Sequence, residues 1–269
     1  MKNPTASMLV IGDEILTGRT RELNMHFLAI ELSKVGIDLK EVRIVRDYKP
    51  AIISAVRILS TYFDFVFTSG GIGPTHDDIT SESMAEAFNR PIDINEDARK
   101  KLEDYYLGLG KKLNSARLRM ARIPKGAKLI KNSVSAAPGF SIENVHVMAG
   151  VPKVFQAMVS SILKTLKRGT PTLSRTLKLL LAESEIAALL EKLATDYPKL
   201  SIGSYPFDIN SEFGVNIVVR GSSSDLIDQY SLSGLAKHNK KDIKTFNASK
   251  YQMIYKLITS IYYYQSFPA

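Results

Sequence analysis

The N-terminal part of the chain alternates short apolar runs with stretches in which an apolar residue recurs every three or four positions. The apolar runs predict strands, and they read SMLVIG (7–12), DLKEVRIVRD (38–47) and DFVFTSGG (64–71). A helical pattern follows each run. The first helix should end at Gly36 and the second should begin at Pro50, and the third should begin near Thr80. The residues expected to face the core are Met25, Leu28, Ala29, Leu32 and Val35 in the first helix and Ile52, Val56 and Leu59 in the second. The predicted order is therefore strand and helix, repeated three times.

Such alternation with short connections predicts a mostly parallel sheet with helices on both faces, a three-layer α/β/α fold. Ligands bind such sheets at the carboxyl ends of the strands, where the winding direction reverses. If the strand order begins 2-1-3, two loops meet in one crevice, GDEILTGR (12–19) and GGIGPTHDD (70–78).

The pattern changes after the third helix. A charged helix (95–110) precedes KKLNSARLRMARIPKGAKLIKN (111–132), which has eight basic residues and no acid. A turn, SAAPGF, then leads to a strand, VHVMAGV (145–151), and to a helix from Pro152 that should close the first domain on the sheet. We expect three parts: a domain over 1–169, a small α+β module of strand, helix and hairpin over 170–230, and a basic, tyrosine-rich tail over 231–269, in which residues 251–264 could form a helix.

Composition and charge narrow the class of protein. The 269 residues are 45% hydrophobic and 23% charged, as in globular proteins. Of the net charge of +9, residues 231–269 supply +5, from six lysines and one aspartate, so the excess is mostly a property of the tail and nucleic-acid binding is not favoured. The sequence contains no cysteine, which excludes disulfides, thiolate metal sites and cysteine nucleophiles. No signal-peptide core and no run of about 20 apolar residues is found, so we expect a soluble, cytoplasmic protein without a membrane partner.

The glycine loop carries the main candidate chemistry. Gly70, Gly71 and Gly73 let backbone N–H groups approach an anion, and the helix near Thr80 adds its positive end. The density of oxygen ligands from Thr75, Asp77 and Asp78 suits Mg²⁺, which binds through one or two carboxylates and the phosphates of a substrate. The alternatives are a plain strand-to-helix turn and a helix cap for either aspartate. His76 could be a base or a ligand, although a lone histidine is more often neither.

Other candidates lie on neighbouring loops and in the basic run. Asp13 and Glu14 follow the first strand, and at most one of them should face the crevice from an extended chain. Asn24 reads as an N-cap. In the basic run, Asn114, Arg117 and also Arg119 could reach phosphates, or the run could be a solvated face. Gly139 and Gly150 could be plain turns or sites of close backbone approach, and no Ser-His-Asp arrangement or Walker lysine is present.

The motifs GDEILTGRTRELN, TSGGIGPTHDDITSE, LRMARIPKGAKLIKN, APGF and AGVP occur in an order and spacing that resembles the molybdopterin-binding domain superfamily. The resemblance runs from Ser7 to Arg168 and is strongest to the competence/damage-inducible (CinA) branch and to the corresponding domain of eukaryotic FAD synthases. The next segment, from SRTLKLLLAESEIAALLEKLA to IGSYPF, resembles less strongly the segment that follows this domain in FAD synthases. Ala149 stands where CinA relatives usually carry proline, and the chain after Asp228 matches nothing familiar.

The resemblance implies the three-layer fold, a homo-oligomer (dimer or trimer), and binding of molybdopterin or metal-dependent hydrolysis of ADP-containing pyrophosphates such as ADP-ribose or FAD. The implied ligand contacts are Gly70, Gly71, Gly73 and Thr75, and we add Ser69, Asn114 and Arg117 as candidate substrate contacts. The implied catalytic or metal-binding acids are Asp77 and Asp78, with Asp13 and Glu14 as further metal ligands. Mg²⁺, or Co²⁺ or Mn²⁺, would be the cofactor. No resemblance to the amidase domain of long CinA proteins or to the adenylyltransferase domain of FAD synthases is found, so neither activity is expected.

Three hypotheses follow. The first is a metal-dependent pyrophosphatase with Asp78 as principal ligand and Arg117 neutralising developing charge. The second is a molybdopterin-binding protein of cofactor biosynthesis that performs no hydrolysis. The third is an interaction module whose basic tail contacts acidic partners or nucleic acid.

Overall fold

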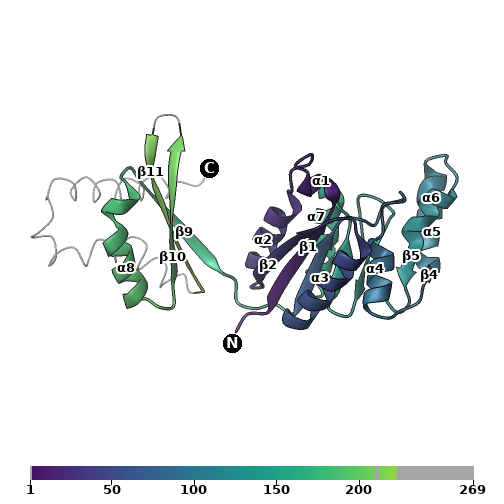
Figure 1. Cartoon of the computed structure of the whole chain (residues 1–269), viewed down its shortest axis with the longest axis horizontal. Coiled ribbons are helices and arrows are strands. Elements are labelled where there is room, and N and C mark those ends of the chain that lie inside the picture. The colour runs from purple at the N-terminus through teal and green to yellow at the C-terminus, as the bar shows by residue number, and fades with distance from the viewer. Residues whose placement is uncertain (1, 210–211, 223–269) are drawn as a thin grey trace, which may run out of the picture. The chain divides into compact units, whose positions relative to one another are not determined.

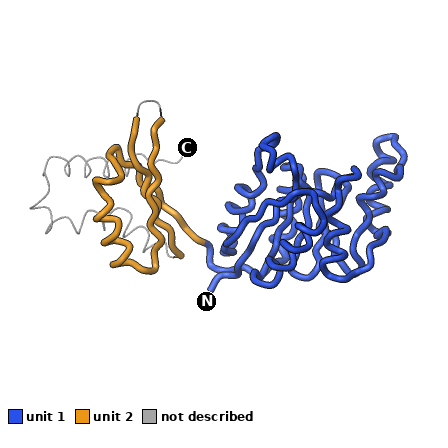
Figure 2. Tube along the Cα trace, viewed as in Figure 1, with its two compact units in different colours: residues 1–171 blue, residues 172–269 orange. Residues whose placement is uncertain are grey.

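The computed structural model of the chain describes residues 2–209 and 212–222. It divides into two compact units, one ending at Pro171 and one beginning at Thr172 (Figure 2). In the first unit the predicted alternation of strands and helices is present (Figure 1). Its first elements are β1 (Thr5–Ile11), α1 (Asp13–Leu16), α2 (Asn24–Lys34), β2 (Asp38–Val45), α3 (Lys49–Tyr62), β3 (Phe65–Ser69) and α4 (Thr80–Ala87).

The central sheet has six strands in the order β2-β1-β3-β8-β7-β6. β8 (Val145–Met148) is followed by α7 (Pro152–Ile162). β1 pairs in parallel with both β2 and β3, and β3 pairs in parallel with β8. The expected 2-1-3 start and the mostly parallel α/β/α fold are therefore confirmed, and the carboxyl ends of β1, β3 and β8 lie next to one another.

The other end of the sheet was not predicted. β7 (Gly139–Ile142) and β6 (Lys128–Ile130) add to β8 antiparallel, and β4 (Ile92–Ile94) pairs with β5 (Arg122–Pro124) in a separate ribbon. The intervening helical elements are α5 (Glu96–Gly108), α6 (Ser115–Leu118) and the 3-10 helix η1 (Arg119–Ala121). Gly139 is a point of close backbone approach rather than a plain turn, since a Cβ there would lie 2.4 Å from the carbonyl oxygen of Val147.

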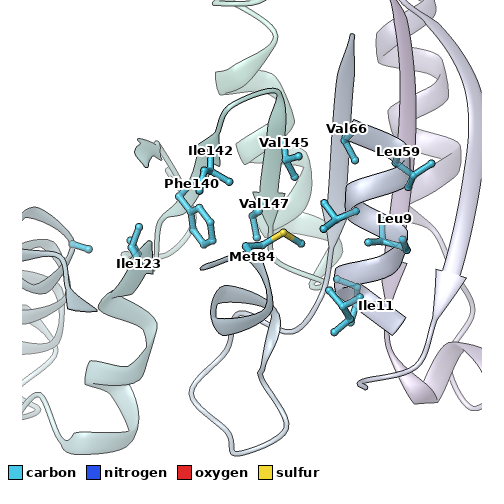
Figure 3. Close-up of a cluster of buried hydrophobic side chains, with 14 of the residues drawn as sticks. Leu9, Ile11, Leu59, Val66, Met84, Ile123, Phe140, Ile142, Val145 and Val147 are labelled. Carbon is cyan, nitrogen blue, oxygen red and sulfur yellow. The ribbon is translucent and has the colours of Figure 1, made fainter. Parts of the chain in front are cut away.

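The core lies on both faces of this sheet. Leu9 and Ile11 of β1 pack with α3 and α4, while Met8 and Val10 pack with α2 and α7. Figure 3 shows the first of these clusters, in which Leu59 and Met84 meet Val66, Val145 and Val147. Alternate residues of buried parallel strands face opposite helical layers, so the near-continuous apolar runs of the sequence are explained. On α2, Leu28 and Leu32 are buried as predicted, whereas Met25 is 39% exposed.

The second unit consists of β9 (Leu173–Leu179), the 3-10 helix η2 (Glu183–Glu185), α8 (Ala187–Asp196), β10 (Ser201–Ile209) and β11 (Glu212–Gly221). Its antiparallel sheet has the order β10-β11-β9, and its own core includes Leu177, Val215 and Ile217. The small α+β module is thus present, while the predicted tail over 231–269 lies outside the described residues. Among those described, no helix has the length and apolarity that a membrane crossing requires.

Candidate functional site

The candidate site is built on the loops that leave the carboxyl ends of β1, β2, β3 and β8. The N–H of Gly12 donates to the carbonyl of Val45 (3.2 Å), and the N–H of Gly70 donates to that of Met148 (3.1 Å). A Cβ on Gly70 would lie 2.1 Å from the carbonyl oxygen of Ile11. The loops after β1 and β3 therefore start side by side, as the strand order predicts.

The glycine loop has a structural role and an open set of donors. Gly70 and Gly71 have φ of 109° and 70°, and a Cβ on Gly71 would lie 2.1 Å from Oγ1 of Thr80. These two glycines let the loop pack against β1 and α4. In the described part of the chain, no protein group accepts a hydrogen bond from the N–H groups of Gly71 to Gly73, so these amides are available to an anion.

Asp78 closes the glycine loop. Its Oδ2 accepts hydrogen bonds from the N–H and the hydroxyl of Thr75, at 2.8 and 2.6 Å. α4 begins at Thr80 without a side-chain cap, so neither Asp77 nor Asp78 caps this helix. The Thr75 hydroxyl, the backbone N–H of Asp77 and the neighbouring His76 hold the pKa of Asp77 below its ordinary value. The structure thus brings Thr75, Asp77 and Asp78 into one loop, with Asp78 in a positioning role.

The acids after β1 meet an aspartate that the sequence analysis missed. Asp47 follows β2, and its Oδ2 accepts a hydrogen bond from the N–H of Asp13 at 2.9 Å. Burial raises the pKa of Asp47, and the nearby carboxylates of Glu14, Asp13 and Asp77 raise it further. These four acids therefore lie in one region of the site. Asp47 could have been predicted, because it follows the strand that ends at Val45 and ligands bind at the carboxyl ends of such strands.

Asp13 is already paired. Its carboxylate lies 3.1 Å from Nε of Arg46, and this hydrogen bond is the main cause that lowers the pKa of Asp13. The carboxylate of Glu14 instead lies over Gly12, where a Cβ would be 2.7 Å from its oxygens. Across residues 2–209 and 212–222, no three or more His, Asp or Glu side chains form a group that could hold a metal ion. The predicted ligands Asp13, Glu14, Asp77 and Asp78 do not gather into one.

The predicted phosphate contacts in the basic run have other partners. Asn114 caps α6 by accepting a hydrogen bond from the N–H of Arg117 (2.9 Å), and the guanidinium of Arg117 lies 4.2 Å from the centre of the Tyr106 ring. Neither side chain lines the small pocket beside the glycine loop, which has a volume of about 10 Å³.

Two other arginines line that pocket. It is formed by Ile72, Gly73, Asp78, Ser81, Glu82, Arg119 and Arg122. Arg122 pairs with Glu82, and the buried Nε of Arg119 has no hydrogen-bond partner among the described residues. Of the predicted basic candidates, Arg119 is thus the one beside the loop. Arg122 was missed because periodicity does not rank the members of a basic run.

A second pocket, of about 60 Å³, lies between α2 and the ends of β1 and β3. Asn24 is buried there, and its Nδ2 donates to Oγ of Ser69 (2.8 Å) and to the carbonyl of Gly150 (2.7 Å). The N-cap prediction for Asn24 is wrong, because Glu22 accepts from the N–H groups of Asn24 and Met25, at 3.0 and 2.8 Å. Ser69, a predicted substrate contact, lines this pocket and is engaged by Asn24.

Comparison with known proteins identifies both units. The family model for the probable molybdopterin binding domain matches residues 7–168, and the model for the FAD synthase middle domain matches residues 171–239. A protein of Archaeoglobus fulgidus is 34% identical over 199 residues, which are 74% of this chain and 84% of that protein.

Two further relatives connect the chain to the branches named above. A probable FAD synthase of Caenorhabditis elegans is 32% identical over 248 residues, covering 83% of this chain; the chain spans only 48% of that relative's length. The crystal structure of CinA from Thermoplasma acidophilum, described as a protein of unknown function, is 33% identical with a TM-score of 0.56. It covers 61% of this chain, and 99% of that structure is matched. The resemblance inferred from the motifs is confirmed.

Proposed function

This chain belongs to the family of probable molybdopterin-binding domains and is CinA-like, and from that membership we propose that it hydrolyses an ADP-containing dinucleotide or nucleotide sugar of the ADP-ribose or FAD type. Water would attack one phosphorus of the pyrophosphate and the P–O–P bond would break. The products would be AMP with ribose phosphate, or AMP with FMN.

The observation that carries the proposal is the meeting of an acidic region with open backbone donors. Glu14, Asp47 and Asp77 follow three different strands, and the carboxylates of Glu14 and Asp77 are close enough to that of Asp47 to raise its pKa. The N–H groups of Gly71 to Gly73 belong to the same loop as Asp77 and have no protein acceptor in the described chain. Negative charge beside anion-binding donors suits a site that takes a phosphate together with a cation.

The acids fit a cation that is shared with the substrate. Mg²⁺ commonly uses one or two carboxylates and completes its octahedron with water and phosphate oxygens. Asp13 is committed to Arg46 and Asp78 to Thr75. One or two of Glu14, Asp47 and Asp77 would therefore hold Mg²⁺, Co²⁺ or Mn²⁺ together with the substrate, since no three acids of the described residues form a group that could hold the ion by themselves. Such an ion, when bound, neutralises phosphate charge and lowers the pKa of a bound water.

The remaining groups bind and orient the substrate. The amides of Gly71 to Gly73 would donate to phosphate oxygens, because the packing of Gly70 and Gly71 fixes the loop before substrate arrives. Arg119 would take the role that the sequence analysis gave to Arg117, since Arg119 lines the pocket beside Gly73 and Arg117 does not. Asp78 would keep Thr75 and the loop in place.

The test is turnover of ADP-ribose and FAD by the full chain with Mg²⁺, Co²⁺ and Mn²⁺, measured as release of AMP. We expect Asp77→Asn and Asp47→Asn to lower kcat by about a hundredfold or more, because each removes a charge that holds the cation. Asp104→Asn, on the exposed surface of α5, is the matched control and should leave kcat unchanged. Absence of turnover with every metal, or equal turnover in all variants, would rule the proposal out for these substrates.

A non-hydrolytic molybdopterin-binding protein of cofactor biosynthesis is the second candidate. It is favoured by the lack of a three-residue group of metal ligands in the described chain, since pterin binding needs donors but no resident metal. Calorimetric titration separates the two proposals. Tight pterin binding together with absent hydrolysis would support the carrier, and binding of ADP-ribose alone would oppose it.

A further inference from the structure

The three-stranded sheet of the second unit has two faces of different character. One face packs with Leu190 of α8 and forms the core of the unit, with strand residues that include Leu177, Val215 and Ile217 (Figure 1). Because successive strand residues point to opposite faces, the register of the sheet places the intervening residues on the other face. This second face, which we call the aromatic face, carries Tyr205 and Phe207 of β10, Asn216 and Arg220 of β11, and Lys178 of β9.

Two aromatic rings lie against the sheet on this face, each over a glycine. A Cβ on Gly203 would lie 3.0 Å from the hydroxyl oxygen of Tyr205, and a Cβ on Gly214 would lie 2.8 Å from Cζ of Phe207. A larger residue at either position would meet the ring, so the two glycines allow the rings to lie close to the backbone. Tyr205 is nevertheless 45% exposed. Its ring therefore rests on the strand and presents its outer side to a planar partner.

A cation accompanies each ring. The guanidinium carbon of Arg220 lies 5.7 Å from the centre of the Tyr205 ring, and its Nη2 donates to the Tyr205 hydroxyl at 3.2 Å. Nζ of Lys178 lies 4.7 Å from the centre of the Phe207 ring. Lys178 also pairs with Glu212 at 2.9 Å, whereas no carboxylate of residues 2–209 and 212–222 pairs with Arg220. The Tyr205 hydroxyl thus holds an unneutralised guanidinium beside an exposed ring, where it can bind an anion.

We propose that the aromatic face binds single-stranded nucleic acid, with a base stacked on Tyr205 and the two flanking phosphates at Arg220 and Lys178. Ser201, which lies opposite Arg220, precedes Tyr205 on β10, and Phe207, which Lys178 contacts, follows it. The order along β10 is therefore cation, ring, cation. A free nucleotide has phosphate on one side of its nucleoside, whereas a nucleoside within a strand has a phosphate on either side, so this order matches a strand. Proteins hold single strands by stacking bases on aromatic side chains beside cations that track the backbone.

The other groups of the aromatic face suit a base better than an apolar partner. Asn216 lies directly opposite Tyr205 and is partly exposed. Its side-chain amide makes no hydrogen bond within the described part of the chain, and an amide both donates and accepts, so it can contact the edge of a base on the neighbouring ring. Lys178 and Arg220 outnumber Glu212, which leaves net positive charge for phosphate. The net charge of the chain does not reveal this face, because most of that charge lies in the tail.

The experiment is fluorescence anisotropy of a labelled single strand of about ten nucleotides, made as RNA and as DNA, titrated with the full chain. The wild-type protein should bind at least one of the two strands with a dissociation constant below about 100 μM, the weak limit of non-specific binding. Y205A should raise this constant by about tenfold or more, because it removes the stacking surface. Y205F keeps the ring and should stay within about threefold of wild type. R220E should raise the constant by about tenfold, because it places a negative charge beside a phosphate.

K164E is the matched control for R220E, since it makes the same change of charge at an exposed residue of the first unit, and it should bind like wild type. Circular dichroism checks that every variant is folded. Absence of binding at about 100 μM overturns the proposal, and so does a folded Y205A that binds as tightly as wild type. Equal losses in R220E and K164E overturn it as well, because the strand would then be held by charge elsewhere, such as the lysines of residues 231–269.

A competition with AMP distinguishes a strand from a free nucleotide. AMP should not displace the labelled strand at comparable concentrations, because it offers one base and a phosphate on one side only. Displacement by AMP as effective as by the unlabelled strand would mean a site for free nucleotide and would overturn the proposal. The measurement is of binding and needs no turnover, so its outcome is independent of whether the first unit hydrolyses ADP-ribose or FAD.

Discussion

His146 is a buried histidine on β8 that the functional site does not use. It is 4% exposed, its Nδ1 lies 2.9 Å from Oγ of Ser141, and its ring lies 5.2 Å from that of Phe67. Burial lowers its pKa from 6.5 to about 4, because a charged imidazolium would lose its hydration among apolar neighbours. His146 is therefore neutral in the folded protein at neutral pH.

This pKa shift makes stability depend on pH. Between pH 6.5 and 4 the unfolded chain binds a proton at His146 that the folded chain does not, so the free energy of unfolding falls as the pH drops through this window. The loss from pH 7 to pH 4.5 should be on the order of 2 kcal/mol. Urea unfolding of wild type and His146→Gln at both pH values tests it. The variant should lose less stability than wild type, and equal losses would show that His146 does not titrate as inferred.

Replacing Gly71 by alanine should lower the free energy of unfolding for two reasons, backbone strain and steric overlap, and Gly18 shows the first of these alone. Its φ of 70° is close to the 72° of Gly18, yet a Cβ on Gly71 would lie 2.1 Å from Oγ1 of Thr80, whereas a Cβ on Gly18 has no heavy atom within 4 Å. We expect Gly18→Ala to cost about 1 kcal/mol from backbone strain alone. Gly71→Ala should cost about 2 to 4 kcal/mol because it adds overpacking. Chemical denaturation measures both, and similar costs would contradict the close packing of the loop.

At the level of single residues, the sequence named candidate residues but not their partners. Residue type and position after a strand pointed to Asp13, Asp77 and Asp78 as candidates. Which carboxylate is free depends on partners distant in sequence: Arg46 engages Asp13 from 33 residues away. The cap of α6 at Asn114 and the stacking of Arg117 on Tyr106 depend equally on local folding that composition does not reveal.

Among the elements, apolar runs predicted the parallel strands because those strands are buried on both faces. β4, β5 and β6 have only three residues each, too few to show a period, and β5 lies inside the basic run. The same shortness hid the antiparallel end of the sheet. Periodicity is informative where an element is long, and these strands are too short to show it even where they are buried, as at Ile123 of β5.

The N-terminus of α2 is stabilised by Glu22, a residue that precedes the helix. Glu22 accepts hydrogen bonds from the N–H groups of Asn24 and Met25, and its charge complements the helix dipole. We expect Glu22→Ala to lower the free energy of unfolding by about 1 kcal/mol. Glu22→Gln keeps one acceptor oxygen and should lose roughly half of that. Denaturant titration of both variants checks the order, and a Gln variant less stable than the Ala variant would refute it.

For the whole molecule, each unit has its own core, since the clusters around Leu9 and Met8 lie in the first unit and the cluster around Val215 lies in the second. The last residues of the first unit are also hydrogen-bonded to other residues of the same unit. Asn3 donates from Nδ2 to the carbonyl of Thr170 (3.0 Å) and accepts from its N–H (2.9 Å), and the N–H of Gly169 donates to Val35 (3.1 Å). The first unit should therefore fold without the second.

This gives a prediction about where the chain can be cut. A fragment of residues 1–171 keeps both cores and all three of these hydrogen bonds, so it should unfold in one cooperative transition and retain any turnover that the full chain shows. A fragment of residues 1–166 loses the three bonds and should be less stable by about 1 to 2 kcal/mol, because hydrogen bonds at the surface contribute little each. Urea titration followed by circular dichroism compares them. If the longer fragment is unfolded, the first unit depends on the residues beyond 171; if the two fragments are equally stable, the contacts of Gly169 and Thr170 do not fasten the end of the domain.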